Sequence, residues 1–139
     1  MKVVVDTNIV FSTMLSKNSF LRQTLLRSDL QFYAPNYLFT ELFKHKERIL
    51  SLSSETEQNI YVFLTVLLEH INFLSPHLIS KSSYQTAYAL CKNIDEADTP
   101  FVALTIELSA VLWTGDKRLK DGLQKQGFNH FLVVNSFSN

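Results

Sequence analysis

The chain has 139 residues, the size of one ordinary domain, and 46% of them are hydrophobic, which is enough to bury a core. Its 13 basic and 13 acidic residues cancel to a formal net charge of zero, which excludes a strongly basic protein that coats itself with polyanions. A lone cysteine excludes an intramolecular disulfide and suits a reducing cytoplasm, and the apolar runs are too short for a membrane helix. We therefore expect one cytoplasmic domain over residues 1–139, with no membrane partner.

The first predicted element is a strand over residues 2–5. Its Val-Val-Val run is apolar and β-branched, which is typical of a central strand covered on both faces. Asp6 ends this strand, and Thr7 and Asn8 are expected to open a turn. In open α/β sheets, the carboxyl end of a buried strand is where ligands bind. A carboxylate there loses hydration, so Asp6 needs a partner, and a cation is the obvious candidate.

The next segment is expected to be a loop containing Phe11 and Met14, which could belong to a self-association surface. Three elements should follow in chain order: a helix over 20–27, a strand over 31–34 and a helix over 37–46 capped by Asn36. Ser54 and Glu57 then form a capping-box pattern before a helix that runs to about residue 70.

The C-terminal half continues to alternate strands and helices. The predicted elements are a strand over 71–74, helices over 82–92 and 99–109, a strand over 111–113, a helix over 117–126 that Gly127 stops, and a strand over 131–134. This alternation predicts a three-layer α/β/α sandwich around a central, mostly parallel sheet with right-handed crossovers.

Four acidic residues are candidates for a shared site. Asp6 and Asp116 each follow a predicted strand, and the carboxyl ends of parallel strands share one edge of the sheet. Glu41 borders the apolar stripe of its helix, and Asp98 precedes a helix, so the fold must place both. Taken alone, each acid could equally be a cap, a turn former or part of a solvated face, and Asp98 could simply cap its helix.

The chemistry of these acids points to a hard cation. They have no nearby cluster of His or Cys, and carboxylate oxygens suit Mg²⁺ or Mn²⁺ rather than Zn²⁺. A pocket of four acids fits phosphodiester hydrolysis with one or two metal ions better than it fits a structural metal site.

Four segments resemble the acidic motifs of PIN domains: Val-Val-Asp-Thr-Asn at 4–8, Glu41, Asp-Thr-Pro-Phe-Val-Ala-Leu at 98–104, and Leu-Trp-Thr-Gly-Asp-Lys-Arg-Leu at 112–119. Over residues 2–134 the chain resembles, more closely, the PIN-family toxins of bacterial type II toxin–antitoxin systems (VapC-like). The resemblance implies a PIN-like sandwich and a Mg²⁺- or Mn²⁺-dependent endoribonuclease.

The resemblance also implies roles for single residues. Asp6 would be the central metal ligand, with Asp98 and Asp116 completing the ligand set directly or through water. Glu41 would bind metal or orient the attacking water. The polar neighbours that support these acids would be Asn8, Thr114 and Asp95, although Asp95 could simply be solvated. Such toxins usually form homodimers, cleave RNA, and are inhibited by a small antitoxin that places a basic side chain among the acids.

Basic residues follow two of the acids. Lys44, His45, Lys46 and Arg48 come after Glu41, and Lys117, Arg118 and Lys120 come after Asp116. Both groups could hold phosphates beside the scissile bond, or they could be solvated helix faces. The residues taken as candidate RNA contacts are Lys44, Lys46, Lys117 and Arg118.

Two other interpretations were weighed. Haloacid-dehalogenase-like phosphatases also start with an apolar strand and an aspartate motif, and Gly115-Asp116 with Asp121 resembles their later motif. However, Asn8 stands where their second aspartate would act as general acid, and Glu41 would have no role. A non-catalytic PIN-fold scaffold or RNA-binding protein is the second alternative, although all four acids are present.

Overall fold

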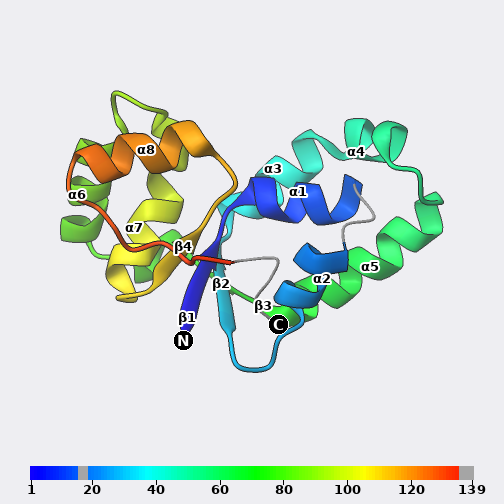
Figure 1. The fold of residues 1–139 in the computed structure, drawn as a ribbon. Helices are drawn as coiled ribbons and strands as arrows, with labels where there is room; N and C mark the ends of the chain where they lie inside the picture. The colour runs from blue at the N-terminus through cyan, green and yellow to red at the C-terminus, as the bar shows by residue number, and fades with distance from the viewer. Residues whose placement is uncertain (16–18, 135–139) are drawn as a thin grey trace.

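The computed structural model describes residues 1–15 and 19–134 and contains a four-stranded, all-parallel sheet (Figure 1). The strand order is β3-β2-β1-β4, and the strands are β1 (Lys2–Val5), β2 (Gln31–Pro35), β3 (Ile71–Leu74) and β4 (Val111–Trp113). The register pairs Val4 of β1 with Tyr33 of β2 on one side and with Leu112 of β4 on the other. The predicted α/β fold class with a parallel central sheet is therefore confirmed.

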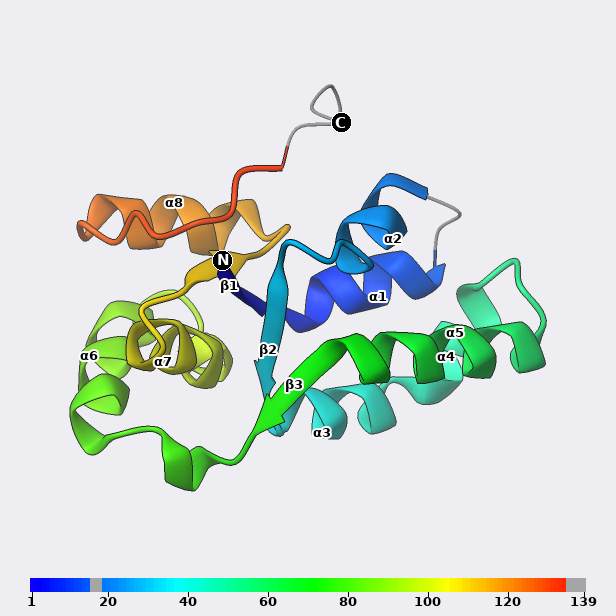
Figure 2. The same cartoon turned by 90° about the horizontal axis from the view of Figure 1, so that it is seen from below.

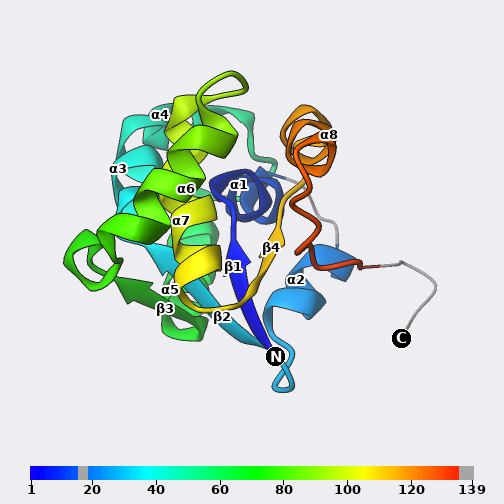
Figure 3. The same ribbon diagram turned by 90° about the vertical axis from the view of Figure 1, so that its left-hand side faces the viewer.

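Helices cover both faces of this sheet. The α-helices are α1 (Thr7–Leu15), α2 (Ser19–Leu25), α3 (Tyr37–Lys44), α4 (Lys46–Leu52), α5 (Glu57–His70), α6 (Lys81–Cys91), α7 (Thr99–Glu107) and α8 (Lys117–Lys125). Two short 3-10 turns, η1 (Pro76–Leu78) and η2 (Glu96–Asp98), lie between them. Helix α7 packs on β1, β2 and β4 with α6 beside it, while α1 and α2 lie on the opposite face (Figures 1 and 3).

The central strand shows why this layering forms. Val3, Val4 and Val5 are completely buried, although successive side chains of a strand point to opposite faces. Both faces of β1 must therefore be covered. At the edge of the sheet, α5 runs directly into β3 without a loop (Figure 2). No helix within the described ranges is both long and apolar enough to cross a membrane.

The segment after β1 differs from the prediction. It is the helix α1, which begins at Thr7 directly after Asp6, and not a turn and loop. The backbone N–H groups of Ile9 and Val10 donate to the Asp6 carbonyl at 3.1 and 3.5 Å, which closes the first turn. Met14 is buried, so the predicted self-association surface there is wrong for this residue.

Two predicted helix boundaries were wrong as well. Asn36 has helical backbone angles and makes no side-chain cap, and the predicted helix over 37–46 is broken at His45 into α3 and α4. Helix α5 is capped by Thr56, whose hydroxyl accepts the Asn59 N–H at 3.2 Å, and not by Ser54. For α5 the neighbouring Thr56 satisfies the helix end in place of Ser54, so the local pattern was insufficient to identify the cap.

Thr56→Ala is expected to lower the free energy of unfolding by about 1 kcal/mol, because it removes this N-cap. Ser54→Ala is the matched control, since Ser54 is exposed and outside the helix, and it should change stability by less than about 0.5 kcal/mol. Urea unfolding followed by circular dichroism measures both. A larger loss for Ser54→Ala would mean that Ser54 caps α5 in solution.

The predicted strand over 131–134 is also wrong. Phe131 forms only an isolated parallel bridge with Leu112, through the bonds from Leu112 N–H to the His130 carbonyl and from Leu132 N–H to the Leu112 carbonyl. Strand β4 is three residues long, so it offers little edge for further pairing, and Val133 is left 81% exposed. The predicted stop of α8 is confirmed, since Gly127 has the positive φ of 89° that favours glycine.

Candidate active site

Asp6 lies where β1 ends, held against the end of β4. Its backbone N–H donates to the Trp113 carbonyl at 3.0 Å, and the Thr114 hydroxyl donates to its Oδ2 at 2.7 Å. The same Thr114 oxygen accepts the Asp116 N–H at 3.0 Å. Asp6 is only 4% exposed. Thr114 thus links the two acids that follow the neighbouring strands, and β1 and β4 are paired in the register that brings these ends together.

Glu41 reaches this edge from α3. The Thr7 hydroxyl, at the start of α1, donates to Glu41 Oε1 at 2.6 Å, and Thr7 is itself buried. Sequence reasoning gave Thr7 no role beyond a turn. The available signal was its place directly after Asp6 in the Val-Val-Asp-Thr-Asn segment, but the partner on α3 requires the fold.

Asp98 ends η2 just before α7, and its side chain does not cap the helix. The pKa of its carboxyl is raised from 3.8 to about 7, mainly by burial and in addition by the negative charges of Asp6, Asp95, Asp116 and Glu41. Because charges act strongly only over short distances, the acids that contribute to this shift lie within electrostatic range of Asp98, although burial is the larger cause.

Asp95 has a structural task of its own. It is exposed, and its Oδ1 accepts the Ala97 N–H at 3.0 Å as the N-cap of η2. Its predicted role beside the metal ligands stays a prediction. Asn8 is exposed on α1, and its backbone N–H is bonded to the Asp6 carboxylate, which lowers the pKa of Asp6.

The acids have no cationic partner among the described residues. Burial is the largest cause that raises the pKa of Asp6, and the charges of Glu41 and Asp116 add to it against the opposing hydrogen bonds from Thr114 and Asn8. Within the described residues, the only ion pair joins Arg27 and Asp29. Close carboxylates without a cationic partner repel one another, so this arrangement favours a bound cation.

The donor set fits a hard divalent cation. All four side chains offer only oxygen atoms as ligands. Asp116 accepts the Leu119 N–H at 3.1 Å with one carboxylate oxygen, and Glu41 accepts the Thr7 hydroxyl with one of its oxygens. Each of these two acids has a second carboxylate oxygen that could bind a metal ion. As placed, no three His, Cys, Asp or Glu side chains of the described residues form a ready metal-binding group. Mg²⁺ commonly takes only one or two carboxylates and keeps several waters, so the residues present still fit it.

The predicted RNA contacts differ in their surroundings. Lys44 is exposed at the end of α3, and Lys117 and Arg118 are exposed in the first turn of α8, which Asp116 caps. Lys46 turns elsewhere. Its Nζ lies 5.6 Å from the centre of the Tyr61 ring, and a hydrogen bond with Tyr61 raises the pKa of Lys46.

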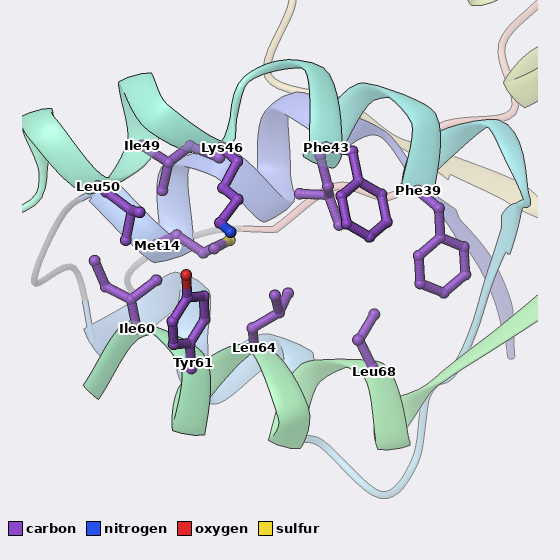
Figure 4. Close-up of a pocket in the computed structure, with 11 residues that line it drawn as sticks. Met14, Phe39, Phe43, Lys46, Ile49, Leu50, Ile60, Tyr61, Leu64 and Leu68 are labelled. Carbon is purple, nitrogen blue, oxygen red and sulfur yellow. The ribbon is translucent and has the colours of Figure 1, made fainter. Parts of the chain in front are cut away.

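Lys46 borders an apolar groove of about 240 Å³ (Figure 4). Figure 4 shows Phe39 and Phe43 on one wall, facing Leu64 and Leu68 of α5. None of the four acids lines this groove. It is therefore a separate surface of the molecule.

Comparisons with known proteins agree with this architecture. Among solved structures, the chain is similar to the crystal structure of VapBC2 from Rickettsia felis bound to a DNA fragment from their promoter. The TM-score is 0.63 and the identity 18%, over 87% of this chain and 92% of that chain, so the likeness shows the fold alone. No curated protein matches the sequence. A family model of the PIN domain matches residues 4–132, a span that contains all four acids. The chain therefore belongs to the PIN-domain family.

Proposed function

We propose that this PIN domain is a Mg²⁺- or Mn²⁺-dependent endoribonuclease that hydrolyses RNA phosphodiester bonds, and that it is the toxin of a toxin–antitoxin pair. The observation that carries the proposal is that Thr114 links Asp6 and Asp116 at the ends of β1 and β4, while Thr7 holds Glu41, and no basic side chain of the described residues is paired to these acids. Asp98 joins them in the proposal because their charges raise the pKa of its carboxyl in addition to burial. PIN-family membership and the VapBC2-like fold support the same proposal.

The chain's own residues would divide the work. Asp6 and Asp98 would hold the cation, with Asp116 contributing its free oxygen directly or through water. Glu41, fixed by the Thr7 hydroxyl, would orient the attacking water. When bound, the metal would polarise the phosphoryl group and ease ionisation of that water, so no histidine base is required.

Partners form part of the proposal. A small antitoxin is supported by the nature of the similar structure, a VapBC2 complex, and by four carboxylates that would accept a basic side chain. A homodimer is also proposed, and light scattering of the purified protein tests it. The phosphatase alternative is not pursued, because the match is to PIN domains.

The direct test is cleavage of a mixed set of single-stranded and structured RNAs by the purified protein. Cleavage with Mg²⁺ or Mn²⁺ that stops in EDTA supports the proposal. A folded protein that binds RNA but leaves every RNA intact would contradict it and favour the non-catalytic scaffold.

Asp98→Asn is expected to reduce RNA cleavage by more than about 100-fold, whereas Asp95→Asn should reduce it by less than about 10-fold. Asp98 is partly buried and its pKa responds to the other acids, while Asp95 is exposed and caps η2. Cleavage rates of the two variants at saturating Mg²⁺ measure the difference. Equal losses would mean that the third metal ligand is misassigned.

A further inference from the structure

A cleft of about 490 Å³ is lined by residues that lie close in sequence to three of the acids, Asp6, Glu41 and Asp116. Its walls come from α1, from the junction of α3 and α4, and from the loop between β4 and α8. Residues that carry its chemistry are Asn8, Phe11, His45, Arg48 and Gly115. Helix α1 lies against both α3 and α4, so these walls are held by direct packing (Figure 1).

The cleft is continuous along the chain with the acids. Asn8 follows Asp6 on α1, and Gly115 directly precedes Asp116. His45 comes one helical turn after Glu41, and its N–H donates to the Glu41 carbonyl at 3.1 Å. Three of the four acids are therefore followed or preceded in the sequence by residues that line the cleft. We expect a ligand in the cleft to lie next to the candidate metal site.

The cleft has a basic and aromatic lining, in contrast to the negatively charged group of acids. No acidic residue lines it. Arg48 is exposed and makes no ion pair within the described residues. His45 and Phe11 meet edge to face, with ring centres 5.6 Å apart and planes at 81°. An unpaired guanidinium beside aromatic rings is the combination that binds single-stranded nucleic acids, through a phosphate and a stacked base.

The acids make such a cleft necessary for an RNA substrate. Their charge repels phosphates, so affinity for the chain on either side of the scissile bond must come from cationic and stacking groups that the acids do not neutralise. Arg48 meets this need, whereas Lys46 is turned toward Tyr61.

We propose that this cleft binds the nucleotide next to the scissile phosphate, with Arg48 on its phosphate and its base against the rings of His45 and Phe11. The inference rests on the proposed ribonuclease function and assigns part of the substrate to named residues. The sequence already placed His45 and Arg48 in the basic group after Glu41, but Lys44 and Lys46 were taken as the candidate RNA contacts there; the cleft favours Arg48 and His45 instead.

The test measures RNA binding separately from cleavage. In an Asp6→Asn background with Mg²⁺, a short fluorescent single-stranded RNA of mixed sequence is titrated at several salt concentrations. Arg48→Ala should weaken binding about 10-fold and lower the slope of log affinity against log salt by about 1, while Arg48→Lys keeps the slope. Arg27→Ala is the matched control, because Arg27 lies just before β2, at the amino end of the strands, whereas Asp6 and Asp116 follow their carboxyl ends. This control variant should leave affinity and slope unchanged.

The aromatic contact has its own readout. His45→Ala should weaken binding about 5-fold or more without changing the salt slope, and His45→Phe should restore the affinity, because a ring is kept for stacking. All variants are compared by thermal unfolding. Should Arg48→Ala fail to fold, Arg48→Gln and Arg48→Lys still separate the charge from the bulk of the side chain.

The outcomes separate this inference from the proposed function. If the wild type cleaves RNA but Arg48→Ala binds with the affinity and slope of its parent, the cleft inference is overturned and the ribonuclease stands, which leaves the cleft to a protein ligand. If the wild type binds RNA through Arg48 but never cleaves, the nuclease proposal fails and RNA binding in the cleft survives. If no RNA binds at all, both fail.

Discussion

Asparagine in place of Asp6 is expected to abolish metal-dependent RNA cleavage and to leave a folded protein that is more stable than the wild type in EDTA. Asp6 is 4% exposed, and burial together with the charges of Glu41 and Asp116 raises the pKa of its carboxyl. Asparagine keeps an oxygen for the Thr114 hydroxyl and removes the repelling charge. It also removes the central candidate metal ligand. Loss of a residue that only supports a ligand typically lowers activity by roughly 10–100-fold, so the cleavage rate of Asp6→Asn should fall by more than that.

Cleavage rates with Mg²⁺ and melting temperatures in EDTA measure the two halves of this expectation. Asp121→Asn is the matched control, because Asp121 is an exposed aspartate on α8, and both its rate and its melting temperature should stay at the wild-type values. A destabilised Asp6→Asn protein would assign Asp6 to holding β1 and β4 together. Full activity in a folded variant would remove Asp6 from the catalytic set.

The four strands of the sheet were predictable because their signal is local. Val111–Trp113 is an apolar run that Thr114 and Gly115 end, Ile71–Leu74 is apolar except for Asn72, and they form β4 and β3 as predicted. Helix α1 lacked such a signal. It is rich in β-branched residues and is buried on several sides, so it shows no clear amphipathic period. Its packing against α2, α3, α4 and α5 stabilises the helix instead.

The residues of the candidate site also differ in how far the sequence could place them. Asp6 and Asp116 could be placed together from the sequence, because both follow strands of one parallel sheet. Glu41 and Asp98 come from helical segments, and only the packing of α3 and α7 around β1 brings them near Asp6. The Thr7 to Glu41 hydrogen bond and the cleft at Arg48 depend on contacts between distant segments, which no local pattern encodes. The catalytic and metal-binding roles of these residues stay predictions.

The metal-free protein is expected to lose stability as pH rises from about 4 to about 7, because Asp98 holds its proton more tightly in the folded state than in the unfolded state. The pKa of Asp98 is about 7 in the fold, against 3.8 for an ordinary aspartate. Within this window the folded state binds more protons, so stability is greatest below the unfolded pKa and declines toward the folded pKa. Asp6, whose pKa is also raised, acts in the same direction.

Melting temperatures in EDTA across this range measure the decline, and Asp98→Asn should flatten it, whereas Asp121→Asn should run parallel to the wild type. Mg²⁺ should reverse the trend, since a cation binds the ionised carboxylates and stabilises the fold by mass action, and its effect should be larger near pH 8 than near pH 5. Loss of this Mg²⁺ effect in Asp98→Asn would link the proton and the metal to the same group of acids. A wild-type curve that Asp98→Asn does not alter would instead mean that burial and the other acids do not raise the pKa of Asp98 in solution, and the cation proposed for the site would lose its electrostatic basis.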